Sequence, residues 1–292
     1  MKNRDEIAQA LVRSGYIADS ELATAISLMQ LLKRPLLLEG EAGVGKTEVA
    51  KALAAAHGAE LIRLQCYEGL DQNAALYEWN YQRQLLAIKT REGIGENADA
   101  IEEHIFSERY LLERPLLAAI RRATPPVLLV DEVDRADEEF EAFLLELLSD
   151  FQVSIPELGT IRARQPPFVV ITSNRTREVH DALKRRCLYH WIDYPTLEKE
   201  VAIVRARAPE AADGLAREVA ALVQGLRSMD LYKVPGVAET LDWARSLAAL
   251  GATRIDATLV NATMGAALKY QEDLERARQA VPDLVARVQQ PV

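Results

Sequence analysis

One run of eight residues constrains the fold of this chain more than any other feature of its sequence. Residues 40–47 match the pattern G-x-x-x-x-G-K-[ST] at every position, and they are Gly40, Glu41, Ala42, Gly43, Val44, Gly45, Lys46 and Thr47. An apolar run, Pro35–Leu38, precedes them, and a helix-forming stretch, Glu48–Ala55, follows them. A strand, a glycine-rich turn and a helix in this order predict a loop whose backbone N–H groups surround phosphate oxygens.

The last two side chains of this loop supply its expected chemistry. Lys46 is expected to reach the β- and γ-phosphates of a nucleotide, and the Thr47 hydroxyl to bind Mg²⁺. ATP and Mg²⁺ are therefore the expected cofactors. The alternative is a glycine-rich turn that only begins a helix, but the complete order of strand, loop and helix favours phosphate binding.

Four further apolar runs follow along the first two thirds of the chain, at 61–64, 127–130, 168–172 and 188–192. Continuous apolar runs of this length are typical of strands that are covered on both faces of a parallel sheet. Helical patterns separate most of them, which predicts an α/β fold.

The organisation of the chain changes after Pro195. From Thr196 onward the sequence is rich in Ala, Leu, Arg and Glu, with no strand signal, so we expect an α/β domain over 1–195 and a smaller helical domain over 196–292. Two amphipathic helices are expected at 4–14 and 19–32. The segment 68–113 interrupts the alternation, with a loop tip at Gly93–Asn97, and long excursions of this kind are usually functional or mobile.

Two adjacent carboxylates end the run at Val127–Val130. A buried strand places Asp131 and Glu132 at the carboxyl edge of the sheet, beside the expected phosphate loop. We expect Asp131 to hold Mg²⁺ and Glu132 to orient and polarise the attacking water. An ordinary acidic loop after a strand is the alternative.

Two more polar features follow the acid pair. Asn174 comes shortly after the apolar run at 168–172 and is placed to sense the γ-phosphate. An Asn at a strand end is also a common turn former, which is the alternative. Arg185 and Arg186 end a short helical stretch before the run at 188–192. Cationic side chains also stabilise a helix C-terminus by themselves, so a purely structural role is the alternative there.

The order of these features resembles that of AAA+ ATPases, and most closely the MoxR group. The segments that carry this resemblance are Arg34–Gly40, Asp131–Ala136 and Asp193–Pro195. Three others are similar to the CoxD-type ATPases, which accompany molybdenum-containing carbon monoxide dehydrogenase: LYEWNYQRQ at 76–84, LKRRCLYHWIDYP at 183–195 and PGVAETLDW at 235–243.

This resemblance implies a three-layer αβα ATPase domain with a five-stranded parallel sheet, followed by a small helical lid. It implies that Asn174 is the first sensor, and that Arg186 is the finger that reaches the ATP of a neighbouring subunit, with Arg185 as a second candidate. It further implies a homo-oligomeric ring, usually a hexamer, and a hairpin over Gln152–Ala163. A von Willebrand A-type partner and a metalloenzyme client are the implied partners.

One segment departs from the family pattern. Many MoxR relatives carry Ser-Pro-Arg at the start of a lid helix, where the arginine contacts the γ-phosphate. Here the matching run is Val234-Pro235-Gly236. Either Arg245 on the same helix takes that role, or the second sensor is absent.

Composition bounds the remaining alternatives. The 292 residues carry 35 Lys and Arg against 44 Asp and Glu, a net charge of −9 that argues against non-specific nucleic-acid binding. The leading function is an ATP-driven chaperone that matures or activates a metalloenzyme. A DNA motor or clamp loader on the same fold and a slow nucleotide-gated regulator are the competing functions. The charged N-terminus, Met1–Glu6, and the lack of a long apolar stretch predict a cytoplasmic protein with no membrane span.

A few side chains remain ambiguous from sequence. Tyr77, Trp79 and Tyr81 are spaced as the buried face of a strand, or as an aromatic stripe that binds a partner. The two cysteines, Cys66 and Cys187, cannot form a disulfide framework and are expected to be inert packing residues. The four histidines are scattered, and no protein-built metal cage is expected.

Overall fold

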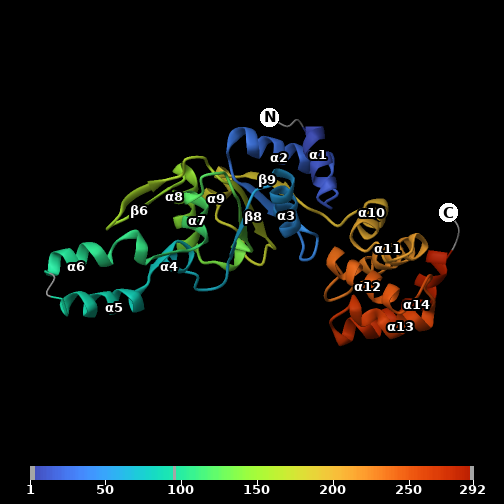
Figure 1. The fold of residues 1–292 in the computed structure, drawn as a ribbon. Helices are drawn as coiled ribbons and strands as arrows, with labels where there is room; N and C mark the ends of the chain where they lie inside the picture. Colours follow the sequence, from blue (N-terminus) through green and yellow to red (C-terminus); the bar gives the residue numbers. More distant parts are fainter. Residues whose placement is uncertain (1–3, 95–96, 290–292) are drawn as a thin grey trace. The chain divides into compact units, whose positions relative to one another are not determined.

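The computed structural model describes residues 4–94 and 97–289 of the chain (Figure 1). The chain divides into two compact units, each made of several segments. The first contains the residues through Ile7, Ser20–Glu39 and Val49–His190, and the second contains Ala8–Asp19, Gly40–Glu48 and the residues from Trp191 onward. The first three residues of the charged N-terminus, Met1–Asn3, lie outside the described residues. So do Gly95 and Glu96 of the expected loop tip.

A five-stranded parallel sheet forms the centre of the first unit. Its strand order is β2-β5-β8-β1-β9, and the strands are β1 (Leu36–Glu39), β2 (Leu61–Gln65), β5 (Val127–Asp131), β8 (Phe168–Ser173) and β9 (Leu188–Trp191). Each of the five apolar runs forms one of these strands, as predicted. Every residue of β1 and β5 is buried, because helices cover both faces of the sheet.

Helices pack on this sheet with continuous apolar faces. The helices around it are α2 (Ser20–Leu32), α3 (Lys46–His57), α7 (Pro115–Arg121), α8 (Glu138–Asp150) and α9 (Asp181–Arg186). In α8, Phe140, Leu144, Leu147 and Leu148 recur at helical spacing and are all buried in the core. The two expected N-terminal helices are present as α1 (Arg4–Arg13) and α2.

Two excursions leave the sheet. The segment after β2 contains α4 (Gln72–Ala75), the antiparallel pair β3 (Tyr77–Trp79) and β4 (Leu111–Glu113), and two helices, α5 (Tyr81–Glu92) and α6 (Ala98–Ile105), that lie side by side (Figure 1). The second is the expected hairpin, with β6 (Gln152–Ile155) paired antiparallel to β7 (Gly159–Arg162).

The C-terminal part of the second unit is helical, as expected from its composition. Its helices, orange to red in Figure 1, are α10 (Leu197–Arg207), α11 (Asp213–Arg227), α12 (Val237–Ala249), α13 (Ala257–Thr263) and α14 (Gln271–Gln289). They surround the fully buried Trp243. An ion pair between Arg227 and Glu200, 2.7 Å between Nη1 and Oε2, lies in the same interior. Removing either partner would leave a buried charge, which typically costs about 3–5 kcal/mol.

No helix within the described ranges combines the length and the apolar character needed to cross a bilayer.

Candidate functional site

The phosphate loop leaves the buried strand β1 directly and ends in the first turn of α3. Its path is tight at Gly40, where an added Cβ would lie 2.2 Å from the carbonyl oxygen of Ile192, so only glycine fits. The Lys46 ammonium is buried and donates to the carbonyl oxygens of Gly40 and Glu41, both at 2.7 Å. The cationic end of Lys46 therefore lies within the loop rather than in solvent.

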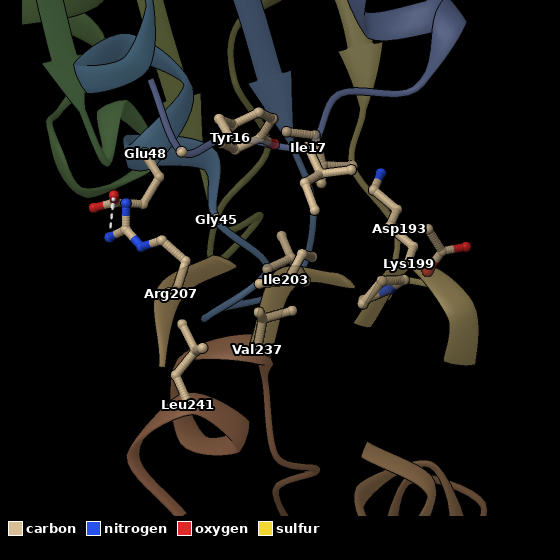
Figure 2. Close-up of a pocket in the computed structure, with 14 residues that line it drawn as sticks. Tyr16, Ile17, Gly45, Glu48, Asp193, Lys199, Ile203, Arg207, Val237 and Leu241 are labelled. Atoms are coloured by element: carbon tan, nitrogen blue, oxygen red, sulfur yellow. Dashed lines mark hydrogen bonds and ion pairs between the residues drawn. The ribbon is translucent and has the colours of Figure 1, made fainter. Parts of the chain in front are cut away.

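An apolar cleft of about 70 Å³ adjoins this loop, and Figure 2 shows the side chains that line it. They come from the segment between α1 and α2, the phosphate loop, the turn before α10, and helices α10 and α12. The lining residues include Tyr16, Ile17, Val44, Gly45, Ile192, Ile203, Val237 and Leu241. The phosphate loop is thus flanked by a small cleft with a largely apolar lining.

Charged groups stand at the edges of the cleft. Arg207 of α10 pairs with Glu48 of α3 at 2.9 Å, drawn as a dashed line in Figure 2, and Lys199 pairs with Asp19 at 3.0 Å. Burial raises the pKa of Tyr16 well above its usual value, and the nearby carboxylates of Asp19 and Glu48 raise it further. The Tyr16 hydroxyl is therefore neutral at physiological pH.

Arg245 does not reach this cleft. Its Nη2 donates to the carbonyl oxygen of Arg207 at 2.7 Å, and its Nε lies 3.5 Å from Glu210. The arginine that lines the cleft is Arg207, on α10. Whether Arg245 replaces the second sensor stays a prediction.

The first acid of the pair, Asp131, ends β5 and is buried. Its Oδ1 accepts a hydrogen bond of 2.6 Å from the Thr172 hydroxyl, and its Oδ2 accepts two from Arg63, at 2.9 Å from Nε and 2.6 Å from Nη2. Such charge-assisted hydrogen bonds fix a carboxylate firmly in one orientation. Asp131 is thus an oriented anionic ligand at the carboxyl edge of the sheet.

The second acid, Glu132, has a left-handed backbone, with φ 56° and ψ 52°. Its N–H donates to the Thr172 hydroxyl at 2.9 Å, so Thr172 bridges both acids. Its Oε2 accepts from Gln65 Nε2 at 3.2 Å and lies 3.0 Å from Arg135 Nε. Glu132 is therefore held by its backbone and by its carboxylate, which is the positioning that a general base requires.

Asn174 follows β8 and is held by a buried acid that the sequence did not single out. Its N–H donates to Asp134 Oδ1 at 3.2 Å, and the N–H and hydroxyl of Thr176 donate to Asp134 Oδ2 at 2.8 and 2.6 Å. Asp134 thereby fixes the chain between Asn174 and Thr176. The sheet order places the ends of β5 and β8 next to each other, so Asn174 lies near the acid pair.

The two candidate finger arginines end α9, and both are exposed. Arg186 Nη1 donates to the carbonyl oxygen of Leu145 at 2.6 Å. Arg34, which precedes β1, donates to the carbonyl oxygens of Arg185, Arg186 and Cys187 at 2.7, 3.0 and 3.1 Å. This single guanidinium caps the C-terminus of α9 and fixes the backbone from which Arg185 and Arg186 project.

Both cysteines are buried, and burial raises the pKa of each thiol to about 12. The acids Asp131, Asp134, Glu132 and Glu141 contribute to the upward pKa shift of Cys66, whereas Arg34 opposes the pKa shift of Cys187. Within the described ranges, no three His, Cys, Asp or Glu side chains are grouped as a metal site.

The aromatic residues that were ambiguous in the sequence have different environments. Trp79 is buried, Tyr77 is half-buried, and Tyr81 is 61% exposed because it begins α5 instead of continuing the strand. The strand interpretation is correct for Tyr77 and Trp79 and wrong for Tyr81.

The parallel sheet, the flanking helices, the glycine loop after β1 and the acid pair after β5 define an AAA+ ATPase fold. Residues 35–187 match the AAA domain family of the dynein-related subfamily, and the chain belongs to that family.

The chain is also similar to several relatives and to a solved structure. The chain is 24% identical over 227 residues to an uncharacterised protein of Staphylococcus haemolyticus, covering 75% of this chain and 78% of the relative. It is 28% identical over 170 residues to an uncharacterised protein of Staphylococcus aureus, covering 56% and 57%. A RuvB mutant of Thermotoga maritima has a similar fold, with a TM-score of 0.50 and 17% identity over 90% of this chain and 70% of that one.

Proposed function

We propose that this protein is a Mg²⁺-dependent ATPase that uses hydrolysis to remodel a partner protein, as the MoxR-type resemblance implies. The observation that carries the proposal is the Asp131–Glu132 pair, which Thr172 bridges at the carboxyl edge of the sheet. In the sheet, a single strand, β8, lies between β5 and β1, and the chain continues directly from β1 into Gly40. The AAA+ resemblance implies that the loop and the acid pair serve one nucleotide.

The side chains present fit a magnesium nucleotide. The Lys46 ammonium is the cation for the terminal phosphates, and it would exchange the carbonyl oxygens of Gly40 and Glu41 for phosphate oxygens. The Thr47 hydroxyl and the Asp131 carboxylate are hard oxygen ligands of the kind that Mg²⁺ prefers. When bound, the metal ion would neutralise charge on the phosphates.

The acid pair divides the remaining chemistry. Glu132 is proposed to orient a water molecule and to accept its proton, since Gln65 and Arg135 hold its carboxylate in place. Asn174 is proposed to sense the γ-phosphate from the end of the neighbouring strand. Arg186 would leave the Leu145 carbonyl to reach the nucleotide of an adjacent subunit in a ring, which we propose to be a hexamer.

Remodelling of a protein, with a metalloenzyme as client and a von Willebrand A-type protein as partner, is the finer part of the proposal. It is supported by the MoxR-like and CoxD-like segments of the sequence. The net charge of −9 disfavours a DNA motor, and no basic run is longer than Lys184–Arg186. The positioned Glu132 disfavours a regulator that binds nucleotide without turnover.

The test compares the parent chain with Lys46→Ala and Glu132→Gln. Lys46→Ala should lose tight ATP binding, because it removes the cation of the loop. Glu132→Gln should bind ATP normally and turn it over very slowly, and proteins retained by it from a lysate would include the client. Glu139→Gln is the matched control, since Glu139 is an exposed carboxylate in the first turn of α8. Normal turnover in Glu132→Gln would show that the water is activated elsewhere.

A further inference from the structure

A second cavity lies in the first unit, away from the residues assigned to nucleotide. It has a volume of about 470 Å³ and is enclosed by the excursion after β2 and by the turn between β6 and β7. The side chains that matter for its chemistry are Asp71, Tyr77, Glu78, Tyr81, Arg114 and Glu157. Its size is within the range of roughly 300–1,000 Å³ that is typical of ligand pockets.

The aromatic wall of this cavity rests on the core. Trp79 is buried and makes edge-to-face contacts with Phe106 and Tyr77, at centroid distances of 5.4 and 6.2 Å. These contacts hold Tyr77 in place at the boundary of the core. Tyr81 begins α5 after the capping Asn80 and exposes most of its ring. The cavity therefore has one fixed tyrosine and one exposed tyrosine.

The charge of the cavity is negative. Three carboxylates line it, and only one of them, Glu78, pairs with the single guanidinium, Arg114, at 2.5 Å. Asp71 accepts from the N–H of Ala74 and thereby caps α4. Glu157 lies at the exposed turn and forms no ion pair with any residue in the described ranges. Tyr77 and Glu157 line the same cavity. Burial raises the pKa of Tyr77, and the Glu157 carboxylate and then Tyr81 raise it further.

We propose that this cavity binds a lysine or arginine side chain of the protein that is remodelled. That side chain would lie between the rings of Tyr77 and Tyr81 and the carboxylate of Glu157. This inference rests on the proposed remodelling function and names the chemistry of the segment that is engaged. A cation over an aromatic face is attracted by the ring, and the methylene stem of a long basic side chain packs on apolar surface. An acidic segment or a nucleic-acid backbone would be repelled by the same carboxylates.

The test uses the full-length chain and two short fluorescein-labelled peptides, in which serine alternates with lysine or with glutamate. By fluorescence anisotropy at low salt, the lysine peptide should bind and the glutamate peptide should not. The double variant Tyr81→Ala/Glu157→Gln should weaken binding of the lysine peptide roughly tenfold, because it removes a cation–π contact and an ion pair.

The controls keep this test independent of folding and of hydrolysis. Glu103→Gln, an exposed carboxylate on α6, and Tyr232→Ala, an exposed tyrosine before α12, should leave binding unchanged. Glu157→Lys should reduce binding of the lysine peptide and gain binding of the glutamate peptide. Equal binding of both peptides to the parent, or no effect of the double variant, would overturn the inference. ATP turnover of the same parent sample tests the proposed function separately, since turnover requires no peptide.

Discussion

The N–H of Val237 donates a hydrogen bond of 2.9 Å to the carbonyl oxygen of Gly43. This bond joins the first turn of α12 to the phosphate loop through backbone atoms alone. The preceding residue, Gly236, is equally close, because a Cβ on it would lie 2.9 Å from the Gly43 Cα and 3.0 Å from the Ala42 carbonyl oxygen. At Gly236 this chain thus brings the helix backbone against the loop.

Gly236→Ala should therefore push α12 away from the phosphate loop. We expect ATP affinity to fall roughly three- to tenfold, with a loss of about 1–3 kcal/mol in the free energy of unfolding from overpacking. Binding of a fluorescent ATP analogue and thermal melting measure the two effects. Gly214→Ala is the control, since the nearest atom to its added Cβ is 4.0 Å away. Unchanged ATP affinity in Gly236→Ala would mean that α12 does not constrain the loop.

Thr172→Val removes the hydroxyl that bridges the two acids while keeping the shape of the side chain. Asp131 would lose one donor in a buried position, and the Glu132 N–H would lose its acceptor in a partly buried one. We expect the free energy of unfolding to fall by about 1–3 kcal/mol. Turnover should fall at least tenfold with little change in ATP affinity, because Glu132 loses its fixed orientation.

Steady-state hydrolysis, nucleotide binding and thermal melting of the Thr172→Val protein separate these effects. Thr160→Val is the matched control, since Thr160 is exposed in β7 and bonds only to Ser154 in the hairpin. If both variants hydrolyse ATP equally well, Thr172 is not a positioning residue.

Arg186→Ala tests the action of one subunit on another. The variant should bind ATP normally and hydrolyse it poorly, because an arginine supplied in trans is worth roughly 10³–10⁵ in turnover. Mixing it with Lys46→Ala subunits should restore part of the activity, since an intact loop can then face an intact arginine. Arg185→Ala should have a smaller effect. A mixture that stays inactive although mixed rings form would assign Arg186 a structural role.

The thiols of Cys66 and Cys187 should not react in the folded protein near neutral pH. Their pKa values of about 12 lie far above the value for a free thiol, so the reactive thiolate is scarce at any pH below that range. Mass spectrometry after brief treatment with iodoacetamide at pH 8 should find both unmodified, and both modified once guanidinium unfolds the chain. Fast labelling of either one in the folded state would contradict its burial.

The sequence was most informative where function depends on neighbours along the chain. The loop at Gly40–Thr47 and the pair Asp131–Glu132 are contiguous motifs, and the strands before them are apolar runs that only a covered sheet can hold. The contacts of Asp131 with Arg63 and Thr172 could not be predicted, because they depend on which strands are adjacent and in what register. The apolar cleft was missed for the same reason, since its side chains come from distant segments and carry no motif.

At Tyr81 the alternation of aromatic residues predicts the wrong secondary structure. Alternating aromatics at 77, 79 and 81 predict a strand with one buried face, yet Asn80 accepts a hydrogen bond from the N–H of Arg83 and starts a helix. A helix cap directly after a short strand changes the direction of the next ring. The cap at Asn80 therefore leaves Tyr81 exposed in the second cavity, the one lined by three carboxylates.

The left-handed backbone of Glu132 implies a trade-off between stability and activity. For a residue with a Cβ, the left-handed conformation costs roughly 1–2 kcal/mol of conformational free energy, whereas asparagine tolerates it better. Glu132→Asn should therefore melt at the same temperature as the parent, or higher, while losing hydrolysis, and the β-branched Glu132→Val should melt lower. Thermal melting of these variants tests this. Folding alone would favour asparagine or glycine at position 132, so the strained glutamate costs stability that the catalytic role proposed for it would offset.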